Sequence, residues 1–520
     1  MTRGEDVRGD KVLVVAFVGD PCGWSRVDYK PTKAPAKGKC NWFDVESIGE
    51  SATSATTLKP LLASGARAAV YVPISVAFGM AGSRARNECC LGVDETDDCS
   101  LDRLGHIKAM AACAQRRLEA FLACELGDTS RVKVMVTPSV GRYRRGDGKA
   151  AAVFRGDAGL YYAYVLVTLY QMLLYYRPET LVVDTTHGIN YATTMGLQAT
   201  QRAAEAYAAA TGSDLRVIVV NSEPVAGEEP QEGVSIYATL CRYIEPSDAV
   251  YSLASLKPPG RIYQPRAIEG EARQPPREVQ ERLKSIVHAT RRVFAAVRAL
   301  AAGLPLLGLH LYSEIENSQL DDIEQALGLV LDLVELASEV KRLGETFEVA
   351  YQYSLDPIDV DSLVAAHALS KALRELLGEA HRRQARHGRA IFYRLDDLEK
   401  IVEKLRGGLL GEQSYYIAMN EVSDMKVRLQ AYDQVIGMSK DNPQLYAKVY
   451  AVAEGNLRAA FQADRVSCNT GERVFYAHAG LVKELLYVVK LDDDAYAVAY
   501  RPECFNNIER KIVAQLEKKR

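Results

Sequence analysis

The chain has 520 residues, which is more than one ordinary hydrophobic core accommodates, so two or three domains are expected. Lys and Arg together number 64, and Asp and Glu number 67. This balance excludes a protein that coats nucleic acid through overall positive charge, and any contact with nucleic acid must be local.

The N-terminal segment, MTRGEDVRGDKVLVVAFVGD, lacks the apolar core and small-residue cleavage site of a secretory signal, so we expect a cytoplasmic protein. The ten cysteines lack the spacing of a metal finger, and the cluster Cys89, Cys90 and Cys99 has no matching His or second pair. We expect reduced thiols and no metal site. In a hyperthermophilic host, a disulfide from this cluster is the alternative.

Strand-like apolar runs alternate with helical stretches up to about residue 225. This alternation predicts a mainly parallel sheet flanked by helices. The expected strands are Val12 to Phe17, Ala68 to Pro73, Val132 to Val136, Leu181 to Asp184 and Leu215 to Val220.

The uncharged segment from Ala158 to Tyr176 approaches the length that spans a bilayer. Six tyrosines are scattered along its whole length, and their phenol groups suit a position beside a sheet better than one in hydrocarbon. We therefore expect a buried helix and no membrane association.

Prolines crowd the region from 226 to 280, where neither a helix nor a central strand tolerates them, so a connecting region is expected there. Beyond it, apolar residues recur at helical spacing and predict a mostly helical C-terminal half. Near the end of the chain, LLYVVK and AYAVAY flank LDDD, which indicates a small β-hairpin.

The segment TLVVDTTHGINYATTMGLQ predicts a strand that ends at Asp184, a polar turn and a long helix. Free backbone N–H groups and the helix dipole favour an anion at such a turn, and His187 adds a donor or a stacking surface. A plainer alternative is that Thr185 or Thr186 only caps the helix.

Other strand ends carry polar or small residues as well: Gly19, Asp20, Pro21 and Trp24 follow the first strand, TPSVGRY another, and Asn221 and Ser222 the last. Ligands of open α/β sheets collect at the carboxyl ends of strands, where these loops converge. Neither G-x-G-x-x-G nor G-x-x-x-x-G-K-[ST] occurs, which disfavours a dinucleotide cofactor or an ordinary nucleotide triphosphatase.

Together, DTTHG before a helix, GDP with Trp24 and Tyr29, and NSEP at the last strand resemble the CRISPR-associated DxTHG family, accessory ribonucleases of type III systems. The resemblance implies an α/β Rossmann-like CARF sensor domain over 1–225, a connector over 226–280, and a mostly α-helical HEPN domain with a small β-hairpin over 281–520. It further implies cyclic oligoadenylate binding across a two-fold dimer interface, with cyclic tetra-adenylate the expected activator and no cofactor. The ligand contacts carried over are Gly19, Asp20, Pro21, Trp24, Thr186, His187, Gly188, Asn221 and Ser222.

In GERVFYAHAGLVKELL, Arg473 and His478 match the family's R-x4-H pattern, with its usual continuation Ala479-Gly480-Leu481. Arg382 and His387 have the same spacing but lie in a charge run, so we favour Arg473 and His478. The resemblance implies metal-independent cleavage of single-stranded RNA in antiviral defence. His478 would transfer protons and Arg473 would hold the scissile phosphate, leaving a 2′,3′-cyclic phosphate end.

Positions five apart on a helix lie about 140° from each other, so one subunit does not naturally present both side chains on one face. The family forms a composite cleft from paired HEPN domains, and a homodimer or a higher homo-oligomer is therefore expected. One departure is Val474, where the family often has Asn directly after the motif Arg.

Two alternatives stay open. In one, the protein is a cyclic-nucleotide-binding regulator with weak or no nuclease activity, and Arg473 and His478 make only a dimer contact. In the other, the sensor hydrolyses its own ligand, for which the sequence has no clear signature.

Overall fold

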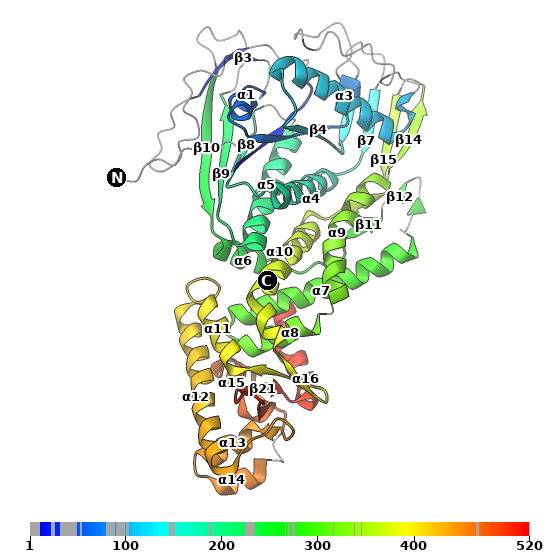
Figure 1. Ribbon diagram of the computed structural model, residues 1–520. Coiled ribbons are helices and arrows are strands. Elements are labelled where there is room, and N and C mark those ends of the chain that lie inside the picture. Colours follow the sequence, from blue (N-terminus) through cyan, green and yellow to red (C-terminus); the bar gives the residue numbers. More distant parts are fainter. Residues whose placement is uncertain are drawn as a thin grey trace, which may run out of the picture.

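The computed structural model describes residues 11–21, 27–31, 49–51, 55–79, 89, 99, 103–144, 151–186, 190–223, 234–265, 267–268, 271–272, 276–315, 317–336, 338–344, 346–463 and 467–518. The N-terminal sheet lies at one end of an elongated molecule and helices α11 to α15 lie at the other, with α7 to α10 between them (Figure 1).

An eight-stranded sheet forms the centre of the N-terminal region, in the order β3-β2-β10-β9-β8-β1-β4-β5. Strand β1 pairs in parallel with β4 and β8, β4 with β5, and β8 with β9, so the five central strands point the same way. The strands are β1 Val12–Phe17, β2 Val27–Pro31, β3 Gly49–Ser51, β4 Arg67–Pro73, β5 Val132–Thr137, β8 Thr180–Asp184, β9 Leu215–Ser222 and β10 Val234–Ile244.

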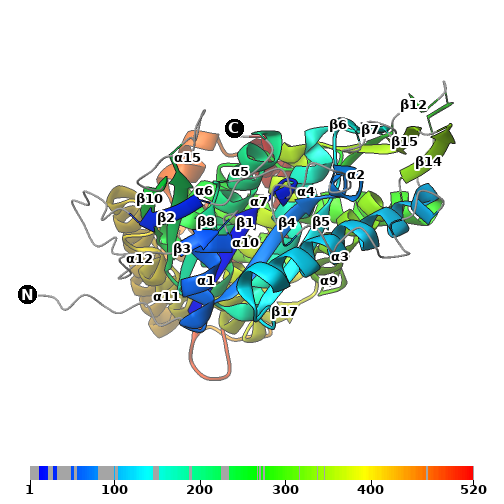
Figure 2. The ribbon, with the colours of Figure 1, turned by 90° about the horizontal axis from the view of Figure 1, so that it is seen from above.

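Helices cover both faces of this sheet (Figure 2). Successive side chains of a strand point to opposite faces, and β1 is buried on both. Val12 and Val14 pack with residues of α1 (Ala55–Ala63) and α3 (Ile107–Leu126), whereas Leu13 and Val15 pack with α4 (Ala158–Tyr176) and α5 (Asn190–Thr211). The expected Rossmann-like α/β architecture is thus confirmed.

Helix α4 is the segment whose apolar length approached that of a membrane span. It is the one described helix long and apolar enough for such a span, and 72% of its most apolar window is buried inside the molecule. It packs closely along α5. The expected buried helix is confirmed.

The region expected to be only a connector contributes to the domain core. Strand β10 pairs antiparallel with β9 along its length, and α6 (Pro246–Ala254) packs against α5. The prolines that suggested a linker lie outside β10, and its residues Val234 and Ile236 are fully buried. The expectation of an irregular connector over the whole of 226–280 is therefore wrong for 234–254.

A second sheet joins distant parts of the chain, in the order β14-β15-β7-β6. Strand β15 (Thr346–Tyr351) pairs in parallel with β7 (Ala151–Arg155), while β14 (Ser338–Leu343) and β6 (Gly141–Arg144) flank them. Two short antiparallel pairs accompany this sheet: β11 Tyr263–Pro265 with β16 Tyr353–Leu355, and β12 Ala267–Ile268 with β13 Glu271–Ala272.

The C-terminal half is largely helical, as expected. Its helices are α7 Arg277–Ala301, α8 Pro305–Glu314, α9 Asn317–Leu336, α10 Pro357–Arg382, α11 Leu395–Leu405, α12 Glu412–Ile436, α13 Tyr446–Ala453, α14 Leu457–Gln462, α15 Glu472–Ala477, α16 Pro502–Ile508 and α17 Ala514–Lys518, with a π-helical turn at Glu509–Val513. One continuous cluster of buried residues runs from β1 through these helices to Leu516, so no break in the core separates the two halves.

A small antiparallel sheet, in the order β17-β18-β21-β20-β19, lies within the helical region. The expected hairpin is present as β20 (Leu486–Lys490) and β21 (Tyr496–Tyr500), and Asp494 adopts φ 62° in its turn. The remaining strands are β17 Ala385–His387, β18 Ala390–Arg394 and β19 Gln444–Leu445.

Disulfide bonds replace the reduced thiols that were expected. Cys89 pairs with Cys124, Cys99 with Cys113, and Cys468 with Cys504. The alternative of disulfides from the Cys89, Cys90 and Cys99 cluster therefore holds for Cys89 and Cys99. Sequence alone could not pair them, because their partners lie 35 and 14 residues away on α3.

Candidate functional site

The carboxyl ends of β1, β8 and β9 meet at one edge of the sheet. Strands β4 and β5 lie on one side of β1, whereas β8 and β9 lie on the other side. The strand order therefore reverses between β1 and β8. Open α/β sheets bind their ligands at such a switch point.

Asp184 ends β8 and organises the turn that follows. Its side chain is fully buried, and its Oδ1 accepts a hydrogen bond of 2.9 Å from the backbone N–H of Thr186. Burial and the nearby charge of Asp184 raise the pKa of Tyr29 on β2 well above its usual value. Asp184 therefore holds the turn.

The two threonines of the turn differ in their contacts. Thr185 donates to the carbonyl of Val220 on β9 from its backbone N–H, at 3.0 Å, and from its hydroxyl, at 2.9 Å. The Thr186 hydroxyl is buried and has no hydrogen-bond partner in the part of the chain that the structure describes. Thr185 thus anchors the turn, whereas the Thr186 hydroxyl is left with an unused donor and acceptor at the switch point.

The other predicted contact residues gather at the same edge. Gly19, Asp20 and Pro21 follow β1, with Gly19 and Pro21 buried and Asp20 half-buried. Asn221, which is exposed, and Ser222, which is half-buried, are the last two residues of β9. Trp24, His187 and Gly188 lie outside the described residues.

A close approach between α5 and β1 fixes the helix beside this edge. A Cβ atom on Gly196 would lie 2.5 Å from the Phe17 ring, which is too close for any side chain. Only glycine, which has no Cβ atom, fits here. Phe17 is the last residue of β1 and is fully buried. Glycine at 196 thus lets the first turns of α5 pack directly against the end of β1.

A tyrosine cluster, which the sequence did not single out, borders the same edge. Tyr161 near the start of α4 and Tyr191 at the start of α5 have ring centroids 5.6 Å apart. Tyr143 on β6 donates to the carbonyl of Val140, which follows β5. The TPSVGRY segment was recognised as a strand-end loop, but nothing local signalled Tyr161 or Tyr191, because only the packing of α4 on α5 joins them.

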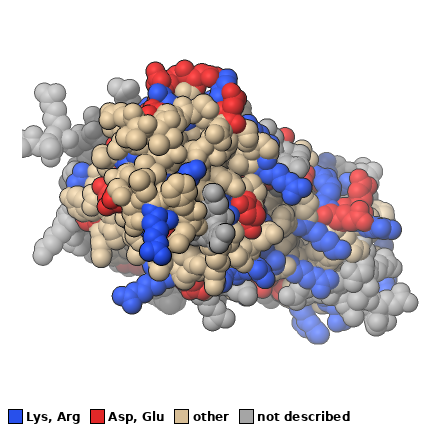
Figure 3. All heavy atoms as spheres, turned by 90° about the horizontal axis from the view of Figure 1, so that it is seen from below, with Lys and Arg blue, Asp and Glu red and all other residues tan. Residues whose placement is uncertain are grey.

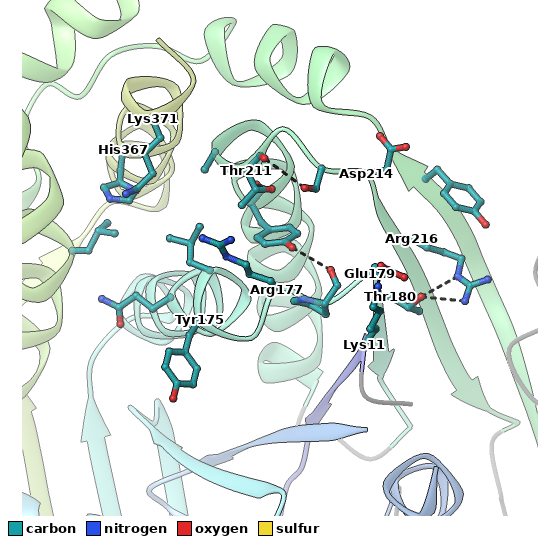
Figure 4. Close-up of a pocket in the computed structure, with 18 of the residues that line it drawn as sticks. Lys11, Tyr175, Arg177, Glu179, Thr180, Thr211, Asp214, Arg216, His367 and Lys371 are labelled. Carbon is teal, nitrogen blue, oxygen red and sulfur yellow. Dashed lines mark hydrogen bonds and ion pairs between the residues drawn. The ribbon is translucent and has the colours of Figure 1, made fainter. Parts of the chain in front are cut away.

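A cavity lies at the opposite edge of the sheet (Figure 4). It measures about 1400 Å³ and is lined by the beginnings of β8 and β9, the ends of α4 and α5, and residues of α9 and α10. None of the described site residues predicted from sequence lines it. His367 of α10 is hydrogen-bonded to Tyr170 at 2.8 Å, and burial, with Lys371 nearby, lowers its pKa to about 4.

Arg473 and His478 lie at the far end of the molecule. Arg473 is on α15, a helix of six residues, and His478 directly follows that helix. The chain turns immediately afterwards, because Ala479 and Gly480 adopt φ 49° and 77°. Both Arg473 and His478 are exposed, and Val474 between them is 46% exposed. Within the described part of the chain, no hydrogen bond or ion pair joins Arg473 to His478.

His478 has one polar partner that the sequence did not indicate. Its Nδ1 lies 3.1 Å from Oε1 of Glu421 on α12. The two residues are 57 positions apart in the chain. No local pattern could have found this pair, because it depends on the packing of the C-terminal helices.

Arg382 and His387, the alternative pair with the same spacing, lie on two different elements. Arg382 is the last residue of α10, and His387 ends the short strand β17. His387 is exposed. The two residues therefore do not share a helix.

The end of the molecule seen from below carries Lys, Arg, Asp and Glu side chains interspersed over a largely uncharged surface (Figure 3). No single basic patch covers the drawn face. This arrangement agrees with the nearly balanced composition.

The fold and the polar strand ends define a Rossmann-like ligand-binding domain with its candidate site at the switch point between β1 and β8. Residues 13–224 match the family model described as CRISPR system endoribonuclease Csx1, CARF domain. The N-terminal region is thus similar to that CARF domain, and the match ends before the helical region. A comparison with curated proteins gave no match.

Proposed function

We propose that the protein is a cyclic oligoadenylate-activated endoribonuclease of type III CRISPR defence that cleaves single-stranded RNA. The match of residues 13–224 to the Csx1 CARF domain carries this proposal. A Rossmann-like sensor region followed by a helical region with an exposed Arg and His suits a protein that senses a ligand at one end and acts at the other.

The proposed activator is cyclic tetra-adenylate, held at the switch point. The Thr186 hydroxyl is buried and has no partner among the described residues, which supports this site, because a ligand phosphate or ribose would supply a partner. Gly19, Asp20, Pro21, Asn221 and Ser222 would contribute from neighbouring strand ends, and Trp24, His187 and Gly188 from the loops. A ring-shaped ligand with repeated nucleotides suits a pocket shared by two subunits.

The proposed chemistry uses the side chains of Arg473 and His478. The ribose 2′-oxygen attacks its own phosphate, loses its proton to an imidazole base, and forms a new P–O bond. The P–O bond to the 5′-oxygen breaks, and that oxygen takes up a proton. Arg473 would stabilise the negative charge on the phosphate, and the products are a 2′,3′-cyclic phosphate and a 5′-hydroxyl.

A homodimer, or a larger assembly built from it, would form the cleft. Arg473 lies on a short helix and His478 beyond its end, both exposed, so a second copy would complete the pair across the interface. The exposed Val474 lies between them and would contribute apolar surface to such a contact.

A second candidate function is a regulatory sensor with little cleavage. The exposed Val474 favours it, because a Val side chain supplies no hydrogen bond where the resembling family often has Asn.

The test mixes purified protein with fluorescent single-stranded RNA, with and without cyclic tetra-adenylate or cyclic hexa-adenylate. We expect cleavage that needs an activator, survives EDTA, leaves 2′,3′-cyclic phosphate ends and disappears in His478→Ala. The matched control His387→Ala should cleave normally. Cleavage without activator that EDTA abolishes would contradict the proposal, and ligand binding without cleavage would favour the regulatory sensor.

A further inference from the structure

The contact between His478 and Glu421 connects two separate elements of the helical region. His478 follows α15, whereas Glu421 lies in the middle of α12. The carboxylate and the imidazole are 3.1 Å apart, with side chains 29% and 50% exposed. The pair is therefore partly open to solvent and accessible to a substrate.

Helix α12 holds the Glu421 carboxylate in place. The neighbouring residues Ala418, Val422 and Met425 are buried, so the backbone at Glu421 is fixed by packing on both sides. By contrast, the exposed His478 directly follows α15, a helix of only six residues. Glu421 thus lies within the longer helix, of 25 residues.

We propose that Glu421 is the positioning residue for His478 in the proposed ribonuclease reaction, and the inference rests on that proposed function. An ionised carboxylate only accepts hydrogen bonds, so Nδ1 of His478 must carry the proton that they share. In the neutral ring, Nε2 is then the free base and faces away from Glu421. Glu421 thereby selects the tautomer and orientation that present Nε2 to the ribose 2′-hydroxyl.

Glu421 also favours the charged ring that forms when Nε2 takes a proton. A carboxylate near an imidazolium stabilises the positive charge, which lowers the barrier to proton abstraction. Glu421 would not itself touch the substrate. Its role resembles that of any acid that orients a histidine base, with the histidine doing the proton transfer.

Other charged and titratable groups surround this pair. Asp424 and Arg428 lie on α12, Tyr446 and Tyr450 on α13. Glu421 and Asp424 help to raise the pKa of the buried Tyr446, which shows that they share its surroundings. The ammonium of Lys483 and the guanidinium of Arg428 each lie 4.1 Å from the Tyr450 ring centroid, and Arg428 is paired with Glu454.

The test compares Glu421→Gln, Glu421→Ala and the matched control Asp424→Asn, one turn along the same helix. Gln keeps an acceptor for Nδ1–H but lacks the charge, whereas Ala loses both. With activator at saturation, we expect kcat to fall about tenfold in Glu421→Gln and about 100-fold in Glu421→Ala, with KM within about twofold of wild type. Asp424→Asn should stay within about twofold in both constants.

Two further measurements exclude a merely structural role. Added formate should partly restore kcat in Glu421→Ala but not in His478→Ala, because a small carboxylate can occupy the space beside Nδ1. In ¹⁵N-histidine spectra of the ligand-free protein, His478 should be the Nδ1–H tautomer, and Glu421→Ala should shift it toward Nε2–H.

The outcomes separate this inference from the proposed function. If the wild type cleaves RNA and Glu421→Ala has an unchanged kcat, the positioning role is overturned while the nuclease stands. If the wild type cleaves no RNA with any cyclic oligoadenylate, the proposed function fails, and a His478 Nε2–H tautomer in the wild type overturns the inference on its own.

Discussion

The Nε of Arg202 on α5 lies 3.3 Å from Oδ2 of Asp361 on α10. Arg202 also pairs with Glu205 at 2.5 Å, and the Tyr162 hydroxyl of α4 donates to Asp361. Glu205 in turn pairs with Arg242 of β10 at 3.3 Å. Helix α5 starts just beyond the Asp184 turn, so this network links the candidate sensor edge to a helix of the C-terminal half.

Replacing Asp361 with Ala should lower the free energy of unfolding by about 2 kcal/mol, because Tyr162 and Arg202 both lose a charged hydrogen-bond partner at a largely buried site. Urea unfolding measures this change. The variant should still bind cyclic tetra-adenylate, but its ratio of activated to basal RNA cleavage should fall severalfold.

The control is Glu375→Ala, an exposed acidic residue of the same helix, which should change the free energy of unfolding by less than about 0.5 kcal/mol. An Asp361→Ala protein with an unaltered activation ratio would exclude a role for this network in coupling.

Thr186→Val tests the sensor pocket without disturbing the turn. Valine matches threonine in shape, and the Thr186 hydroxyl makes no hydrogen bond within the described residues, so stability should change by less than about 0.5 kcal/mol. Affinity for cyclic tetra-adenylate, measured by calorimetry, should fall about tenfold because a polar contact is lost.

Thr185→Val is the matched comparison one residue earlier. Its hydroxyl donates to the Val220 carbonyl, so its loss should cost about 1 kcal/mol of stability while affinity changes less than in Thr186→Val. The reverse pattern, with Thr185 dominating affinity, would contradict the assignment of the contact residue.

Gly196→Ala should destabilise the protein by about 1–3 kcal/mol, because the new methyl group would overlap the Phe17 ring and force α5 away from β1. Thermal unfolding measures the loss. Gly328→Ala is the control, since this α9 glycine is exposed and has open space around its Cβ position.

Gly328→Ala should stabilise the protein by about 0.5–1 kcal/mol, the ordinary helix preference of alanine over glycine. Equal changes in stability at the two positions would show that the contact of Gly196 with Phe17 does not determine the effect of the substitution.

The free energy of unfolding should fall as pH drops from about 6.5 toward 4, because His310 on α8 is buried and must be charged at low pH. Burial, with Arg292 nearby, lowers its pKa to about 4 from 6.5. A histidine with a lowered folded pKa gives stability that is complete above pH 6.5 and is lost as pH falls through 4, here up to about 3 kcal/mol.

Glu314 opposes part of this trend, because burial raises its pKa and its protonation favours the folded state. His310→Phe should flatten the pH dependence, since the ring packs against Phe505 with a centroid distance of 4.2 Å and phenylalanine carries no titrating group. The exposed control His288→Gln should leave the dependence unchanged, and urea unfolding at pH 7, 6 and 5 compares the three proteins.

The central strands could be predicted because each is a short apolar run that the structure buries, as with Leu181–Asp184 within β8. Strand β10 was missed because its outer side chains are exposed and glycine and proline flank it. The pairing of β7 with β15 joins residues 195 positions apart in the chain, which no local pattern encodes.

The residues of the candidate sites also divide into those that the sequence predicts and those that only tertiary packing brings together. Asp184 ends a predicted strand and Thr186 lies two residues beyond it, so their position at the sheet edge could be predicted from the sequence. Glu421 reaches His478 only because α12 packs beside the end of α15, and tertiary packing of this kind has no periodicity to detect.

Removing the Cys468–Cys504 disulfide with a double serine substitution should lower the free energy of unfolding by about 4 kcal/mol, because the bond closes a loop of 36 residues. It should also lower RNA cleavage. The disulfide ties the segment before α15 to α16, and Lys511 donates to Asn469 Oδ1 at 2.7 Å beside it. Among the described residues, the polar contacts between this part of the chain and the C-terminal helices are exposed ones such as this.

The control is a double serine substitution of Cys99 and Cys113, whose disulfide closes a loop of 14 residues in the N-terminal region. It should cost somewhat less free energy of unfolding, about 3 kcal/mol, while cleavage per folded molecule stays at the wild-type value. Cleavage rates are compared at a temperature where circular dichroism shows all three proteins folded. If both double variants lose cleavage equally, the effect comes from general destabilisation, and a specific role of the Cys468–Cys504 bond in holding α15 is refuted.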